Sequence, residues 1–60
     1  MLIVTTVEGR EYTIKCTKYY EYAEDLIGIL SNRSVIQIDY VESTDGTYIL
    51  AKYIVSVRDV

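Results

Sequence analysis

The strongest candidate nucleophile in this sequence is a cysteine without a base. Cys16 is the only thiol, and the chain contains no histidine that could take its proton. A reactive cysteine needs such a neighbour and an accessible position, whereas the pattern around Cys16 places it on the core face of a strand. We therefore expect no catalytic cysteine.

A group of carboxylates within residues 21–25 offers the other potential chemistry. Paired carboxylates act as general acid and base when a cleft holds them beside a substrate. Glu21, Glu24 and Asp25 instead fall near the start of a predicted helix, on its solvated side, where acids interact favourably with the helix dipole. The sequence thus predicts a protein that is not an enzyme, and it leaves open an acidic patch that meets a basic partner.

Metal and cofactor binding are not indicated either. Protein metal sites usually draw on histidines or on several cysteines, and this chain has no histidine and one cysteine. Gly9, Gly28 and Gly46 stand alone in the sequence, so they form no glycine-rich loop to hold a phosphate group. We expect no metal ion and no cofactor.

Tyrosine is the remaining residue type with a clear chemical use. The chain has seven tyrosines and neither Phe nor Trp, and three of the seven stand within residues 19–22. Tyrosine is enriched among residues that dominate binding energy at protein interfaces, and aromatic residues on a small sheet also stack unpaired bases. Four more lie on predicted strands: Tyr12, Tyr40, Tyr48 and Tyr53.

The first element that must position these residues is a β-hairpin at the start of the chain. Two segments rich in β-branched residues flank residues 7–10, and Gly9 supplies the positive φ that a tight connection needs. A three-residue connection separates the apolar face of this hairpin from a mixed face that carries Ile3. The residues expected on the core face are Leu2, Val4, Tyr12, Ile14 and Cys16.

Asp45-Gly46 is the strongest turn signal in the chain and predicts a second hairpin within residues 35–60. A two-residue turn at this pair makes Asp39 face Lys52 across the strands. The second arm is long for a single strand. In the alternative, the chain bends at residues 50–52, and residues 53–57 form a separate final strand.

Between the hairpins, the pattern predicts a helix over residues 18–31, capped by Thr17 and closed by Asn32. Helical spacing puts Tyr19 on the central apolar stripe, so Tyr19 is expected in the core. Tyr20 with Ile27, and Tyr22 with Ile29, form the two flanks of the stripe. The apolar arc is wider than packing on one sheet requires, so at least one flank is surplus.

Together these elements predict an α+β fold, a β-hairpin followed by a helix and a second hairpin, in one domain over residues 1–60. The sheet is mostly antiparallel, with the helix packed on one face. A domain of this size hides only about 60% of the surface of its unfolded chain, so we expect a symmetric homodimer. The expected dimer interface is the other face of the sheet, at Ile3, Val7, Val41 and Leu50.

The start of the chain bears on its location. Met1 leads directly into a segment rich in β-branched residues, without the charged and apolar regions of a signal peptide. The longest apolar runs are only a few residues, which is far too short to cross a membrane. We expect a cytoplasmic protein without a membrane segment.

One resemblance concerns residues 45–57, DGTYILAKYIVSV. This segment looks like the last strands of Sm-like RNA-binding barrels, in which a strand, a short turn and an apolar final strand build a ring interface. The resemblance implies a module that binds RNA or single-stranded DNA, although here the helix sits between hairpins instead of at the N-terminus. The net charge of −3 argues against nucleic acid, and the basic residues are scattered: Arg10, Lys15, Lys18, Arg33, Lys52 and Arg58.

A second resemblance is one of type and covers the whole chain. A small, acidic, tyrosine-rich protein without a catalytic set resembles the inhibitors that phages encode to block host defence or host enzymes. This resemblance implies inhibition by direct binding to a large protein of the bacterial host, such as a defence nuclease or helicase. We place the contact on the surplus helix flank, with Tyr20 or Tyr22 as the anchor beside Ile29, and with a polar rim of Glu21, Glu24 and Asp25.

Overall fold

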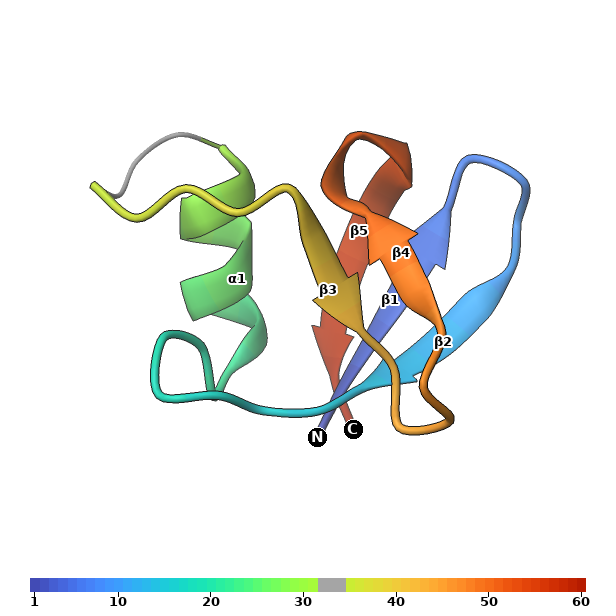
Figure 1. Ribbon diagram of the computed structural model, residues 1–60, viewed down its shortest axis with the longest axis horizontal. Helices are drawn as coiled ribbons and strands as arrows, with labels where there is room; N and C mark the ends of the chain where they lie inside the picture. Colours follow the sequence, from blue (N-terminus) through green and yellow to red (C-terminus); the bar gives the residue numbers. More distant parts are fainter. Residues whose placement is uncertain (32–34) are drawn as a thin grey trace.

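The computed structural model describes residues 1–31 and 35–60 and contains two β-hairpins, a helix and a final strand (Figure 1). All strand pairings within the described part of the chain are antiparallel, so the expected α+β fold is confirmed. In chain order the elements are β1 (Leu2–Thr6), β2 (Glu11–Ile14), α1 (Ala23–Leu30), β3 (Tyr40–Glu42), β4 (Tyr48–Leu50), the 3-10 helix η1 (Ala51–Tyr53) and β5 (Ile54–Asp59).

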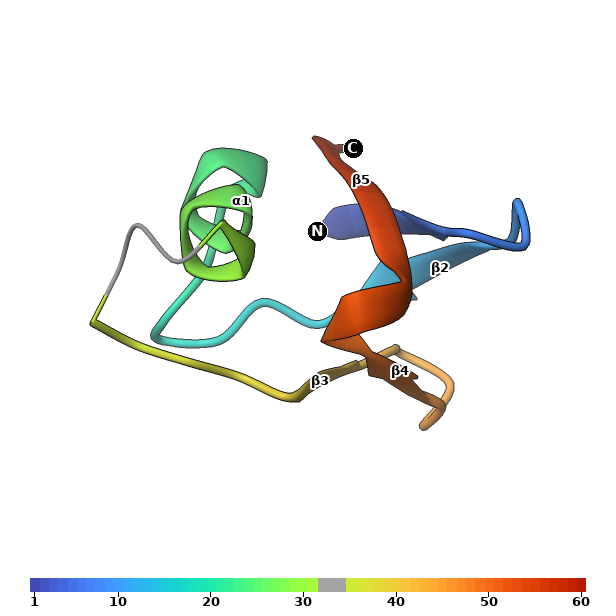
Figure 2. The same cartoon turned by 90° about the horizontal axis from the view of Figure 1, so that it is seen from above.

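The strands form a three-stranded sheet in the order β2-β1-β5 and a separate two-stranded sheet of β3 and β4. The second sheet lies across the first, as the view from above shows (Figure 2). A single bridge between Ile14 and Ser43 connects them at one end. The strand β5 returns to pair with β1, so the two chain ends lie side by side, and Val60 N donates to Met1 O at 3.3 Å (Figure 1).

The first hairpin forms as the sequence predicts. Thr6 N donates to Arg10 O at 2.9 Å, which leaves residues 7–9 as a three-residue connection, and Gly9 has φ of +83°. The register pairs Leu2 with Ile14 and buries both side chains. The expectation for Cys16 is wrong, because β2 ends at Ile14 and Cys16 beyond it is exposed.

The second hairpin has a register one residue away from the expected one. Its connection spans three residues, 44–46, because Ser43 N donates to Thr47 O at 2.8 Å. The Ser43 hydroxyl donates to the Asp45 carboxylate, which in turn accepts from Thr47 N, and Gly46 has φ of +89°. Three-residue loops with glycine in the left-handed region are a common hairpin connection. Asp39 therefore does not face Lys52.

This register decides which side chains of the second hairpin are buried. Val41 pairs with Ile49, and both point into the core, with Val41 only 1% exposed. The expectation that Val41 lies on the outer face is therefore wrong, since a shift of one residue moves every side chain of a strand to the opposite face.

After β4 the chain bends, as the alternative interpretation of the sequence predicted. Residues Ala51–Tyr53 form η1, and β5 then runs as a separate strand beside β1. The β1–β5 ladder shifts register between Thr5 and Thr6, which is a β-bulge that leaves Val55 without a partner in β1.

The helix is shorter than expected and starts at Ala23. Thr17 does not cap it: Thr17 N donates to Tyr20 O, and Thr17 Oγ1 accepts from Tyr19 N, so residues 17–20 form a turn. This turn exchanges the expected roles of two tyrosines, because Tyr20 is 7% exposed and Tyr19 is 50% exposed. Asn32, expected to close the helix, lies outside the described residues.

Two carboxylates hold the N-terminus of α1. Asp25 Oδ2 accepts hydrogen bonds from Tyr22 N at 3.1 Å and Glu21 N at 3.3 Å. Asp59 of β5, 36 positions from its partner in the sequence, accepts from Ala23 N at 2.8 Å. Negative charge at a helix N-terminus satisfies free backbone N–H groups and interacts favourably with the helix dipole. The hydrogen bond from Ala23 N to Asp59 therefore holds the N-terminus of α1 beside β5.

The core lies between the two sheets and α1. It consists of apolar side chains from all three parts and from the turn before the helix: Leu2, Val4, Ile14, Tyr20, Ala23, Leu26, Ile29, Val41 and Ile49.

Replacing Asp59 tests the link between α1 and β5. We expect Asp59→Ala to lower the free energy of unfolding by about 1 kcal/mol, because Ala23 N loses its acceptor. Asp59→Asn keeps an acceptor oxygen and should lose less. Urea unfolding of the three proteins at neutral pH measures both effects, and an Asp59→Ala midpoint equal to that of the natural chain would contradict the prediction.

Tyr20 should make the fold sensitive to alkali. Burial raises the pKa of its hydroxyl above 10.0, although a hydrogen bond with Thr17 opposes the shift. A tyrosine whose pKa is higher in the folded than in the unfolded state makes its full contribution to stability below about pH 10. This contribution is lost as the pH rises through the pKa of the folded state. Urea unfolding measures the free energy of unfolding at about pH 7 and about pH 11. Between these two pH values the decrease should be smaller for Tyr20→Phe than for the natural chain, whereas the exposed control Tyr22→Phe should show the same decrease as the natural chain.

Candidate functional site

The helix flank expected to bind a partner is divided between core and surface. Tyr20 and Ile29 are buried, at 7% and 5% exposed, so neither can anchor a partner, which corrects that expectation. Tyr20 lies in the turn that precedes α1, so it is not part of the predicted helical stripe, and Ile29 lies with Ala23 and Leu26 on the buried side of α1. Tyr22, Glu21 and Glu24 are exposed, and the Asp25 carboxylate is engaged at the helix N-terminus.

The four residues expected at a dimer interface do not form one face. Val41 lies in the core, and Val7 lies in the exposed connection between β1 and β2. Ile3 lies on the outer face of the three-stranded sheet but is half-buried; Arg58, its partner on β5, forms an ion pair with Glu11 at 3.3 Å. Leu50 is exposed on the other sheet.

The outward side of the second hairpin carries an exposed aromatic surface. Because Val41 and Ile49 point inward, their neighbours Tyr40, Tyr48 and Leu50 point outward, at 52%, 64% and 44% exposed. The rings of Tyr40 and Tyr48 lie edge to face with centroids 5.0 Å apart. We call Tyr40, Tyr48, Leu50 and the adjacent Tyr53 the tyrosine face.

Beside this face lies a hollow of about 200 Å³, which we call the tyrosine hollow. It lies between the connection of the first hairpin and the chain that leads from β4 into η1. Val7 N donates to Tyr53 O at 2.9 Å, and this bond holds the two walls together. The lining residues are Thr6, Glu8, Tyr12, Thr47, Tyr48, Ile49, Leu50 and Tyr53.

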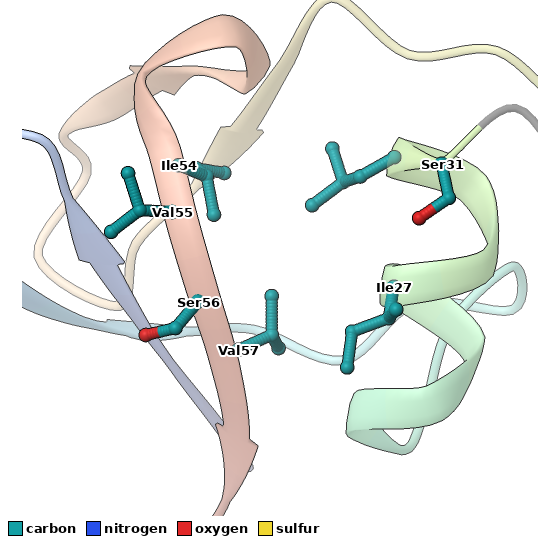
Figure 3. A pocket seen from close by; sticks show the side chains of 7 residues that line it. Ile27, Ser31, Ile54, Val55, Ser56 and Val57 are labelled. Carbon is teal, nitrogen blue, oxygen red and sulfur yellow. The ribbon is translucent and has the colours of Figure 1, made fainter.

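A second hollow of about 430 Å³, the helix–strand groove, lies between α1 and β5. Figure 3 shows Ile54 and Val57 pointing toward the helix, Ile27 pointing back toward the strand, and Val55 and Ser56 on the other side of β5. The bulge at Val55 explains why Ile54 and Val57, three residues apart, share one side of the strand. Ile27 remains 41% exposed at the mouth of this groove.

The remaining potentially reactive groups are dispersed. In residues 1–31 and 35–60, no three side chains of the types that bind metals gather in one place. Cys16 is exposed, and its Sγ lies 3.4 Å from Glu21 O. No helix in the same ranges is long and apolar enough to span a membrane.

Comparisons of the chain with family models, with curated proteins and with solved structures found no match. The candidate surfaces are therefore argued from this structure alone.

The sequence identified the members of the tyrosine face without showing that they gather. Tyr40 and Tyr48 alternate with Val41 and Ile49 along the two strands. With the correct hairpin register, this alternation predicts that both tyrosines lie on the outward face. Tyr53 joins them because η1 turns the chain back, which no local pattern specifies.

Proposed function

We propose that this protein is a small, non-enzymatic inhibitor, encoded by a phage and active in the bacterial cytoplasm, that blocks a host or defence protein by direct binding. The observation that carries the proposal is the tyrosine face. Its tyrosines are large, rigid and amphipathic, and such side chains are enriched among the anchors of protein interfaces. An exposed aromatic surface of this kind is typical of a contact site.

The charge of the protein favours a basic partner surface. The chain carries a net charge of −3, and Glu42 lies opposite Tyr48 on the outward side of the hairpin. Proteins that handle nucleic acid, such as a defence nuclease or helicase, present basic surfaces to phosphate groups. An acidic protein with an aromatic contact face complements a surface of that kind, because opposite potentials speed the encounter and exclude wrong partners.

A second candidate function is binding of RNA or single-stranded DNA, and two observations favour it. Exposed tyrosines on a small sheet can stack unpaired bases. The order of β4, a short bend and β5 also follows the order of elements in the segment that resembles Sm-like barrels. The charge disfavours it, since Lys52 is the one basic side chain in the described ranges that lies over a ring of the tyrosine face.

Capture experiments with matched variants test the proposal. The natural chain, Tyr40→Ala, Tyr48→Ala and the control Tyr22→Ala are each immobilised and incubated with a lysate of host bacteria. We expect one large protein to bind the natural chain and Tyr22→Ala equally well. Its affinity for Tyr48→Ala should be about 30-fold lower, because truncation of an anchor typically costs about 2 kcal/mol of binding free energy.

Two results would contradict the proposal. One is capture that is unaffected by both Tyr40→Ala and Tyr48→Ala in folded proteins. The other is binding of short single strands with an affinity that falls steeply as salt rises, which would instead support the nucleic-acid module.

We further propose that the protein acts as a homodimer, and the helix–strand groove is the surface that supports this. Ile27 is an exposed apolar side chain at the mouth of the groove, Ile54 and Val57 line its opposite wall, and small domains gain stability when such surfaces associate. Light scattering at micromolar concentration should give twice the chain mass of 6.9 kDa. Ile27→Glu should give a folded monomer, and Val7→Glu, at an exposed loop position, should remain dimeric. A monomeric natural chain would overturn this proposal.

A further inference from the structure

One residue of the tyrosine hollow carries a polar group that has no partner among residues 1–31 and 35–60. The Thr6 side chain lines the hollow, and its hydroxyl is buried and makes no hydrogen bond within the described part of the chain. Thr6 is 6% exposed. Buried hydroxyl groups almost always have a partner, and leaving one unpaired costs stability. A ligand with a hydrogen-bonding group would therefore give the Thr6 hydroxyl a partner.

The remaining lining of the hollow is suited to a positive charge. Tyr12, Tyr48 and Tyr53 are among the residues that line the hollow, and the faces of tyrosine rings attract cations. Glu8 lines the same hollow and is the acidic residue of its lining. The protein already shows this chemistry at one of the rings, because Lys52 Nζ lies 5.2 Å from the centroid of Tyr53.

From these contacts we propose that the tyrosine hollow receives an arginine side chain of the partner protein. This inference rests on the proposed function, of which it specifies the contact. A planar guanidinium group can stack on a tyrosine ring while its five N–H donors reach Glu8 and the Thr6 hydroxyl. The volume of about 200 Å³ suits one side chain, since pockets for small-molecule ligands are usually about 300 Å³ or larger.

Other occupants satisfy fewer of these groups. A proline or another apolar side chain would contact the rings but would leave Glu8 and Thr6 unpaired. A nucleotide could stack on the rings, but its phosphate would be repelled by Glu8. Lysine would supply the charge without the planar fork that stacks and donates in several directions. The Thr6 hydroxyl has almost no exposed surface without a ligand, so binding requires a small side-chain rearrangement, which is common at interfaces.

The test uses two short peptides that differ at one atom. The probes are acetyl-Gly-Arg-Gly-amide and acetyl-Gly-citrulline-Gly-amide, because citrulline has nearly the shape of arginine without its charge. In an NMR titration of the whole protein, the arginine peptide should shift the ring signals of Tyr12, Tyr48 and Tyr53 and the methyl signal of Thr6. We expect the citrulline peptide to bind at least about tenfold more weakly.

Three variants assign the contacts. Thr6→Val has the same shape without the hydroxyl, so it should fold with equal or greater stability and yet bind the arginine peptide several-fold more weakly. Glu8→Gln should weaken arginine binding and reduce the difference between the peptides. Lys52→Met removes a competing positive charge beside Tyr53 and should tighten arginine binding.

The outcomes separate this inference from the proposed function. Equal binding of the two peptides, absence of shifts at the hollow, or unchanged binding by folded Thr6→Val would each overturn the arginine assignment. None of these results would affect a partner that is captured through Tyr40 and Tyr48. Conversely, arginine-dependent shifts at the hollow together with capture that is insensitive to both Tyr40→Ala and Tyr48→Ala would keep the arginine-binding hollow and overturn the proposed contact face.

Discussion

The pairing of β5 with β1 is the contact on which the rest of this structure depends. It brings Asp59 to the N-terminus of α1, where its carboxylate accepts from Ala23 N, and so fixes the helix beside the sheet. It also brings Tyr53 against the first hairpin, where Val7 N donates to its carbonyl. Without this return of the chain, the core would lose one wall and the tyrosine hollow would lose the wall that Tyr53 forms.

The hairpins show how far local sequence specifies this fold. Both connections have three residues with an acid before a glycine, Glu8-Gly9 and Asp45-Gly46, and in both the glycine has positive φ. The register predicted for the first hairpin is correct, and the register predicted for the second is wrong by one residue. The error arises because Asp-Gly is also the strongest signal for a two-residue turn. The hydroxyl of Ser43 decides between the two connections, since it donates to Asp45 and also accepts from Thr47 N.

The helix shows where local patterns fail for a physical reason. Helical spacing from residue 18 predicted Tyr19 in the core, but the turn at Thr17 lets Tyr20 enter the core instead. Tyrosine is a modest helix former, and α1 starts where Asp59 accepts from Ala23 N and Asp25 accepts from Tyr22 N directly before the helix. Asp25 is visible in the local sequence, whereas Asp59 is 36 positions away from Ala23, so the observed helix start could not be derived from its own segment.

The same long-range dependence explains the candidate site. Tyr40, Tyr48 and Tyr53 were all expected on strands, but Tyr53 lies in η1, and the three come together only through the hairpin register and the bend at η1. A chain of 60 residues buries little apolar surface, so its core is small. Each exposed tyrosine is a large side chain that does not contribute to this core. Tyrosine tolerates this position because its hydroxyl remains hydrated while its ring stays available for contact. The fold therefore leaves tyrosine rings exposed on the side of β3 and β4 that faces away from the core, and under the proposed function a bound partner would bury them.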